Sequence, residues 1–182
     1  YVKLEATYNG ESLDVTDFED KVLVGQTNGV QAKVIKVEAS TDTDPPTLFV
    51  KYLDSGVNND TASFVAGETL RTNEESAVFA TVGSTTPIGK CIGVLIDEGI
   101  YYIKDHFARV ESNVIILDKY TSNSSYRVGL DVVESVVTYA TDESLLDPAL
   151  GASNYVAPGA DRYKIELILS KRDLSNVISS DT

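Results

Sequence analysis

The stretch GIYYIKDHFARVESNVIILDKY, residues 99–120, alternates short β-branched and aromatic segments with polar residues. Residues of these types in such short runs favour extended strands. A two-residue turn at Lys104 and Asp105 would place Ile103 opposite His106 at the end of a hairpin. The stretch therefore predicts an antiparallel hairpin followed by one further strand.

Stretches of the same kind recur along the rest of the chain, each bounded by Gly, Asn, Asp, Ser or Pro. They are VLVGQT (22–27), AKVIKVEA (32–39), TLFVKYL (47–53), AVFATVG (77–83), KCIGVLI (90–96), YRVGLDVVESVVTYA (126–140) and RYKIELILSK (162–171). Helical signals are few: residues 142–150 predict one turn with Thr141 or Asp142 as N-cap, and residues 171–182 predict another turn or a frayed end. Because strands do not alternate with helices, we expect a mainly β fold with antiparallel pairing and few short helical turns.

The first half contains a faint internal repeat, VLVGQT at 22–27 and FVAGET at 64–69, each leading into an alternating strand. Gly25 and Gly67 in these copies are predicted to supply a positive φ at a turn, or to let the backbone kink as a small barrel closes. A phosphate-binding loop would need a following helix and more glycines, which the repeat lacks. The small polar stretch at 81–89 looks like a joint. We therefore predict a barrel-like repeat module at 1–86 and a β-sandwich at 87–182.

Composition excludes several classes of protein. The chain has 182 residues, and a hydrophobic fraction of 42% argues against disorder. With 15 Lys and Arg against 28 Asp and Glu, the net charge is −13, so a nucleic-acid partner is not expected. Cys91 is the single cysteine, which excludes an intrachain disulfide. No run approaches the roughly 18 apolar residues of a membrane span. Because the chain begins at Tyr1 rather than at methionine, we expect it to belong to a longer polypeptide.

His106, the only histidine, is the residue to test for catalysis or metal binding. Carboxylates lie near it in sequence at Asp97, Glu98, Asp105, Glu111 and Asp118. A histidine with paired carboxylates could hold a divalent ion. A Ser-His-Asp site would also need a serine on a nucleophile turn, and no GxSxG occurs. We favour the interpretation of His106 as a flank of the Lys104-Asp105 turn, and predict no catalytic, cofactor-binding or metal-binding residues.

Carbohydrate binding remains an alternative. With no Trp in the chain, a sugar-stacking surface would have to use tyrosines such as Tyr101, Tyr102, Tyr120 and Tyr126. A depolymerase would need two carboxylates opposed in a cleft, whereas sequence pairs such as Glu74-Glu75 are more often solvated. The acidic loops at 42–44 and 54–60 lack the spacing of calcium loops. We therefore predict that the chain is not an enzyme.

Three successive segments carry a family resemblance: residues 99–120, SYRVGLDVVESVVT (125–138) and DESLLDPALGASNYVAPGADRYKIELILSK (142–171). In this order they resemble a domain of unknown function found in large virion structural proteins of tailed phages, especially contractile-tailed phages of cyanobacteria. The resemblance covers residues 92–175. The form FxxGETxxxxxxxA at 64–77 is similar to small β modules of phage tail and fibre proteins.

The resemblance implies a structural protein of a phage tail, associated with the baseplate or a fibre, with no catalytic residues or cofactors to transfer. It implies assembly in the host cytoplasm into the virion, as a homotrimer in contact with other tail or baseplate proteins. We then expect residues 132–140 and 165–171 to be core or interface strands, and residues 145–162 to pack against a neighbouring element or subunit. The alternative is a receptor- or carbohydrate-binding fibre module that recognises a host surface glycan.

Overall fold

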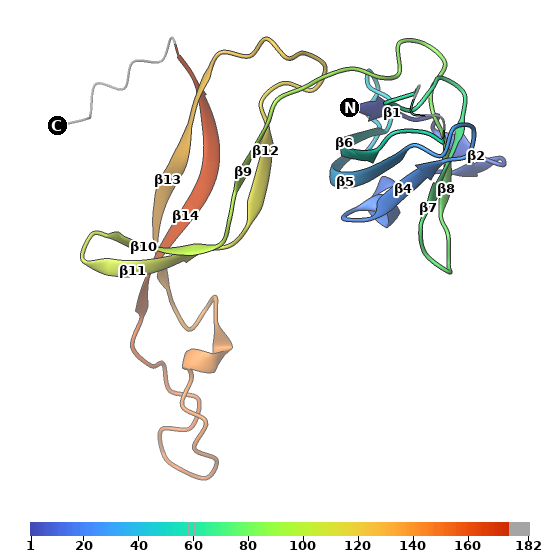
Figure 1. Ribbon diagram of the computed structural model, residues 1–182. Coiled ribbons are helices and arrows are strands. Elements are labelled where there is room, and N and C mark those ends of the chain that lie inside the picture. Colours follow the sequence, from blue (N-terminus) through green and yellow to red (C-terminus); the bar gives the residue numbers. More distant parts are fainter. Residues whose placement is uncertain (58, 60, 175–182) are drawn as a thin grey trace. The chain divides into compact units, whose positions relative to one another are not determined.

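The computed structural model describes residues 1–57, 59 and 61–174, and it is mainly β, as predicted (Figure 1). The chain divides into two compact units. The first unit contains residues 1–93 and 116–124, and the second contains residues 94–115 and 125–182. The helical turn predicted within 171–182 falls mostly on residues 175–182, which lie outside the described residues.

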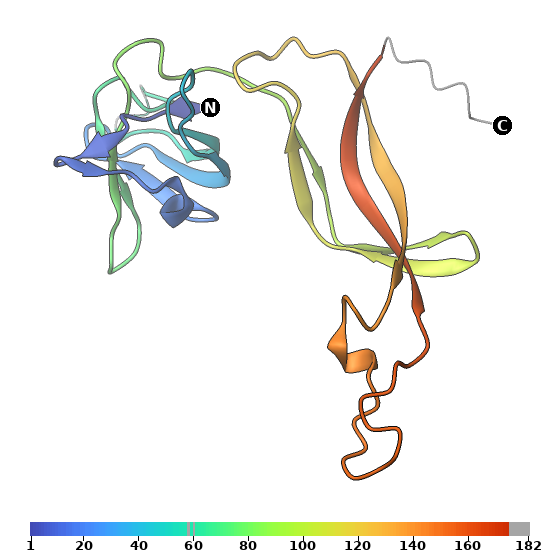
Figure 2. The ribbon, with the colours of Figure 1, turned by 180° about the vertical axis from the view of Figure 1, so that it is seen from behind.

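The first unit is built from short antiparallel strands and one 3-10 helix. Its elements are β1 (Val2–Lys3), β2 (Thr7–Tyr8), β3 (Glu11–Ser12), η1 (Val15–Phe18), β4 (Val22–Gly25), β5 (Gln31–Glu38), β6 (Thr47–Asp54), β7 (Thr69–Thr72) and β8 (Phe79–Thr81). Six of them form one sheet in the order β1-β6-β5-β4-β7-β8, and β2 pairs with β3. Figure 2 shows the ribbon of this unit, in blue to green, from behind.

This sheet closes on itself into a small barrel. Just beyond β1 and β8, Leu4 bridges to Val82, and the Glu5 amide donates to the Thr81 carbonyl at 2.9 Å. The Gly83 amide donates to the Lys3 carbonyl at 2.9 Å on the other side of the bridge. Around the Leu4–Val82 bridge, the closed sheet therefore has no edge left free for pairing. Alternate residues of β4, β5 and β7 point into one core.

The two copies of the repeat meet inside this barrel. In the second copy Phe64 is buried and Gly67 has a φ of +76°, which turns the chain into β7. The buried Glu68 carboxylate accepts hydrogen bonds from the Val65 amide at 2.5 Å and the Thr27 amide at 3.4 Å. Gly25 of the first copy lies against that carboxylate: a Cβ there would be 2.6 Å from Glu68 Oε2. Gly25 thus serves close approach rather than a positive φ.

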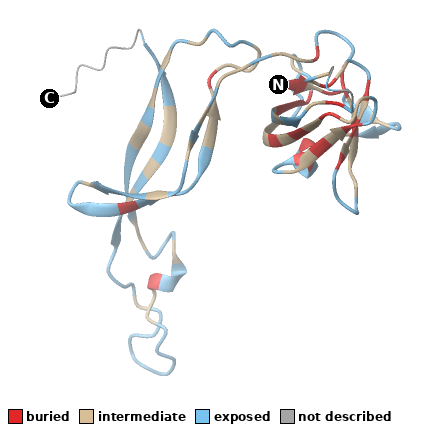
Figure 3. Cartoon of the chain, viewed as in Figure 1, coloured by how far each residue is buried: buried red, intermediate tan, exposed pale blue. Residues whose placement is uncertain are grey.

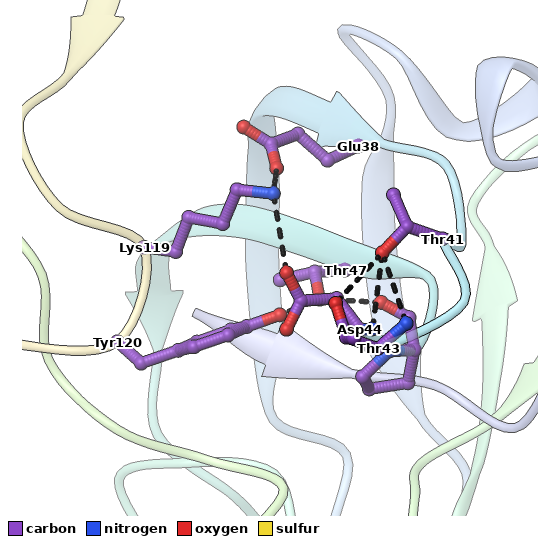
Figure 4. Close-up of polar contacts among 8 residues, drawn as sticks. Glu38, Thr41, Thr43, Asp44, Thr47, Lys119 and Tyr120 are labelled. Carbon is purple, nitrogen blue, oxygen red and sulfur yellow. Dashed lines mark hydrogen bonds and ion pairs between the residues drawn. The ribbon is translucent and has the colours of Figure 1, made fainter.

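Residues 116–124 return to the barrel and are held there by Lys119 and Tyr120 (Figure 4). Lys119 Nζ lies 2.5 Å from Glu38 Oε2 and 3.5 Å from Asp44 Oδ2, between the ends of β5 and β6. The hydrogen bond to Glu38, more than that to Asp44, raises the pKa of Lys119. The Tyr120 hydroxyl lies 3.2 Å from Thr47 Oγ1, and Lys3 Nζ stands 4.0 Å from the centre of its ring.

The second unit consists of two-stranded antiparallel ribbons. Its elements are β9 (Gly93–Ile96), β10 (Gly99–Ile103), β11 (His106–Val110), β12 (Asn113–Ile116), β13 (Tyr126–Val137), η2 (Glu143–Leu145) and β14 (Arg162–Asp173). The pairs are β9 with β12, β10 with β11, and β13 with β14. Asp142 caps η2 by accepting from the Ser144 amide at 3.0 Å, in line with one of the two predicted N-caps.

The β-sandwich expected at 87–182 is therefore replaced by separate ribbons. A sandwich encloses a core between two stacked sheets. Among the described residues of the second unit, the buried hydrophobic side chains are Ala108, Val110 and Leu145, whereas the barrel holds a continuous core (Figure 3). The alternating pattern that predicted the sandwich specifies one apolar face for each strand pair, but it does not specify what covers that face.

Candidate functional site

The ribbon of β13 and β14 has one apolar and one polar face. The strands pair along their whole length, with Leu130 opposite Leu169 and Val132 opposite Leu167. The face that carries these residues, the apolar face, includes Val128, Leu130, Val132, Val136, Tyr163, Ile165, Leu167 and Leu169, and Glu134 also lies on it. Opposite it, Asp131 accepts from Arg172 at 2.6 Å and from Ser170 at 2.7 Å. The structure describes both strands in full, and neither has a buried residue.

The hairpin of β10 and β11 also has two different faces. Lys104 and Asp105, both with positive φ, form its two-residue turn, and Ile103 faces His106 across it. The inner face carries Ala108 and Val110, which are buried. The other face, the outer face, carries three large side chains that remain in solvent: Ile100 is 72% exposed, Tyr102 64% and Phe107 78%.

A charged cluster holds the hairpin turn against the apolar face of the ribbon. Lys104 Nζ donates to one oxygen of Glu134, and the Tyr163 hydroxyl donates to the other. The hydrogen bond from Lys104, followed by that from Tyr163, lowers the pKa of Glu134, and the same contact with Glu134 raises the pKa of Lys104. The His106 ring meets the Tyr163 ring edge to face, with centroids 5.7 Å apart.

Beside this contact an open groove of about 500 Å³ runs between residues 109–113 and residues 165–169 of β14. Val110, Ile165, Leu167, Ile168 and Leu169 supply its apolar lining. Arg109, Glu111 and Glu166 supply charged groups. Because five successive residues of β14 line it, the groove includes the edge of that strand as well as one of its faces.

His106 occupies the flank of the turn. Its Nδ1 lies 2.6 Å from the Lys104 carbonyl oxygen, and the side chain is exposed. Its ring contact is with Tyr163 rather than with a pair of carboxylates. The described residues contain no group of three or more His, Cys, Asp or Glu side chains placed to hold a metal ion.

The four tyrosines proposed as a sugar-stacking surface do not form one platform. Tyr102 is on the outer face of the hairpin, while Tyr101 pairs with Ala108 on the inner face. Tyr126 begins β13, where Lys171 Nζ lies 5.0 Å from the centre of its ring. Tyr120 belongs to the other unit and packs edge to face on Tyr1, with ring centroids 5.0 Å apart. Tyr102 and Phe107 are the aromatic pair that remains in solvent, with centroids 5.1 Å apart.

The connection between β13 and β14, residues 138–161, is held by its own hydrogen bonds. The Asp147 amide donates to the Ala157 carbonyl at 3.0 Å, and the Val156 amide returns a bond to the Asp147 carbonyl at 3.0 Å. Leu150 is 83% exposed, and Tyr155 and Val156 are also exposed. This connection therefore offers further apolar side chains to solvent.

Sequence reasoning missed two sets of polar contacts between distant residues, those of Lys119 in the first unit and that of Lys104 in the second. Lys119 lies more than seventy positions from both of its carboxylate partners. Lys104 and Glu134 are separated by thirty positions, and ordinary surface residues surround both. The acidic residues Glu38 and Asp44, near the two ends of the β5–β6 connection, indicate that a basic side chain could bind there. They do not indicate which of the basic residues of the chain it is.

Comparison with known proteins yields one family. Among the described residues, no helix is long and apolar enough to cross a lipid bilayer. No curated protein and no solved structure gives a significant match to the chain. A family model described as a domain of unknown function, DUF4815, matches residues 82–177, which contain the ribbons, the groove and the connection described above. The chain belongs to this DUF4815 family.

Proposed function

We propose that the chain is a structural component of a phage virion tail, associated with the baseplate or a fibre, and that it acts by assembling with other copies. The observation that carries the assembly role is the exposure of the second unit. Its long ribbon has no buried residue, and the outer face of its hairpin leaves Ile100, Tyr102 and Phe107 in solvent. An isolated two-stranded ribbon is at best marginally stable in water, so further strands or another layer are needed to cover it.

The exposed surface is large enough for a protein interface. Ten large hydrophobic side chains of β9, β10, β11, β13 and β14 are exposed: Leu95, Ile100, Tyr101, Tyr102, Phe107, Val132, Val133, Val136, Tyr163 and Ile168. At on the order of 100 Å² each, they present about 1,000 Å², compared with the roughly 800 Å² per partner of a stable interface. These side chains lie on several faces of the ribbons, and exposed apolar area of this extent favours contacts with other protein surfaces.

The phage tail is inferred from the family resemblance of residues 92–175, which also supports a homotrimer with contacts to other tail or baseplate proteins. The chain would be made in the host cytoplasm and would reside in the virion. A role in assembly needs shape and adhesion rather than a reacting group, so we infer no enzymatic activity.

Sedimentation velocity of the purified chain over a wide concentration range tests the assembly role. We expect a defined oligomer, with a trimer as the leading expectation, and cross-links from residues 94–173 to other tail proteins in intact particles. A chain that stays monomeric at millimolar concentration and forms no cross-link in the particle would overturn the proposal.

A second candidate is a receptor- or carbohydrate-binding module of a tail fibre. The exposed Tyr102–Phe107 pair favours it, because adjacent aromatic rings in solvent can stack on a sugar. A glycan array on host polysaccharides would show binding that Tyr102→Ala abolishes. Binding unaffected by that substitution, or no binding at all, would remove this candidate.

A further inference from the structure

The free edge of β14 is available for strand pairing. Among the residues that the structure describes, β14 pairs with β13 alone, so alternate residues of β14 direct their N–H and C=O groups away from the ribbon. A groove runs along residues 165–169 of this strand, with residues 109–113 on its other side. An edge of this length with apolar side chains is a template for another strand.

The sequence of this edge is complementary to itself. In Tyr163-Lys164-Ile165-Glu166-Leu167, a base and an acid stand at mirror positions about Ile165. Like charges at two such mirror positions would oppose pairing between identical copies, because they would lie directly opposite each other. Here an antiparallel copy centred on Ile165 would place Lys164 opposite Glu166 twice.

The two charged side chains are in a suitable position for such a contact. Both belong to the polar face of the ribbon, and their side chains are 50% and 46% exposed. Within one chain they contact each other, with Lys164 Nζ 2.7 Å from Glu166 Oε1. On the apolar face the same register would place Tyr163 opposite Leu167, and Ile165 opposite its own copy.

We propose that β14 pairs with β14 of a second copy of this chain, antiparallel and about a two-fold axis through Ile165. The result is a four-stranded sheet with β14 and its copy at the centre. This inference rests on the proposed assembly role and deepens it by naming the partner and the register. The contact joins copies in pairs, so a trimer formed through other surfaces would associate further into even multiples.

Charge exchange between copies tests the register in the full-length chain. Lys164→Glu places two carboxylates opposite each other across the contact, and Glu166→Lys places two lysines opposite each other. Each variant alone should associate about tenfold more weakly, because two favourable cross-strand pairs become two repulsive ones. An equimolar mixture should regain the wild-type association constant, because both pairs across the heterodimer are then complementary. Loss of the contact within one chain cannot produce this recovery.

Lys33→Glu supplies the matched control. It makes the same change in net charge at an exposed lysine of the barrel. Lys33→Glu alone should associate like the wild type, and mixing it with Glu166→Lys should leave the Glu166→Lys chain as weakly associated as it is alone. Ile165→Cys, made with Cys91→Ser, should in addition form covalent dimers with a short bismaleimide, since the two cysteines would face each other at the axis.

The outcomes separate the two proposals. Recovery in the mixture together with dimer cross-links at residue 165 supports the β14 contact. A wild-type chain that self-associates, but whose charge variants show neither weakening nor recovery, overturns the β14 contact and leaves the assembly role in place. A wild-type chain that remains monomeric at all concentrations overturns both.

Discussion

Replacing Gly25 with alanine is expected to lower the free energy of unfolding of the barrel by about 1–3 kcal/mol. The new Cβ would lie 2.6 Å from Glu68 Oε2 and 3.1 Å from Phe64 Cδ1. Phe64 is fully buried and cannot move without disturbing the core, so the Glu68 side chain must shift. That shift breaks its bond from the Val65 amide and leaves a partly buried donor without a partner.

Urea unfolding followed by tyrosine fluorescence and by far-UV circular dichroism measures this loss, because the chain has ten tyrosines and no tryptophan. For a unit of about 100 residues, each kcal/mol lost lowers the thermal midpoint by about 4–8 °C. Gly83→Ala is the matched control in the same barrel. Its Cβ would meet the nearest atom at 3.4 Å, an ordinary contact, so its effect should stay within about 0.5 kcal/mol.

A double-mutant cycle with Glu68→Ala tests the cause. If the carboxylate is the obstacle, Gly25→Ala must cost less in the Glu68→Ala background than in the wild type, by at least about 0.5 kcal/mol. Equal costs in both backgrounds would refute the reasoning. So would a Gly25→Ala variant as stable as Gly83→Ala.

Three other perturbations bear on the surfaces described above. Phe107→Ser should leave the unfolding midpoint unchanged, because the side chain is 78% exposed, but weaken self-association about tenfold or more in sedimentation experiments; an unchanged association constant would exclude the outer face from the interface. Lys119→Ala should cost less than about 1 kcal/mol, because its ion pairs are partly solvated, and should speed amide exchange in residues 116–124; unchanged exchange there would contradict its anchoring role. The pKa of Glu134 is lowered by hydrogen bonds from Lys104 and then Tyr163, so its stabilising contact is present above the ordinary carboxyl pKa and is lost as pH falls through the lowered value. Lys104→Ala should raise the Glu134 pKa toward its ordinary value in an NMR titration, and an unchanged curve would count against the contact.

Local features of the fold were predictable because they depend on neighbours in the sequence. The turn at Lys104-Asp105, with Ile103 opposite His106, follows from two polar residues between strand-forming segments. Asp142 was one of two N-cap candidates, and its side chain accepts from the amide two residues later. The mainly β class follows in the same way from many short alternating segments.

Contacts between distant residues were not predictable from these patterns. Gly25 was expected to supply a positive φ at a turn or a kink in the closing barrel, and sequence patterns gave no sign of the close approach of the Glu68 carboxylate from the other copy of the repeat. The position of residues 116–124 on the barrel depends on Lys119 reaching Glu38 and Asp44 across the chain. One lysine among many gives no local sign of such a partner.

The amino-acid sequence by itself determined the strands, the hairpin turn and the apolar face of each strand, because side-chain periodicity and turn chemistry act over a few residues. Only the tertiary structure decided that the first strands close into a barrel while the later ones remain ribbons. The physical reason is that an alternating strand specifies a face to be covered but not the element that covers it. In the barrel, other strands of the same chain cover that face, whereas much of the apolar surface of the ribbons stays in solvent.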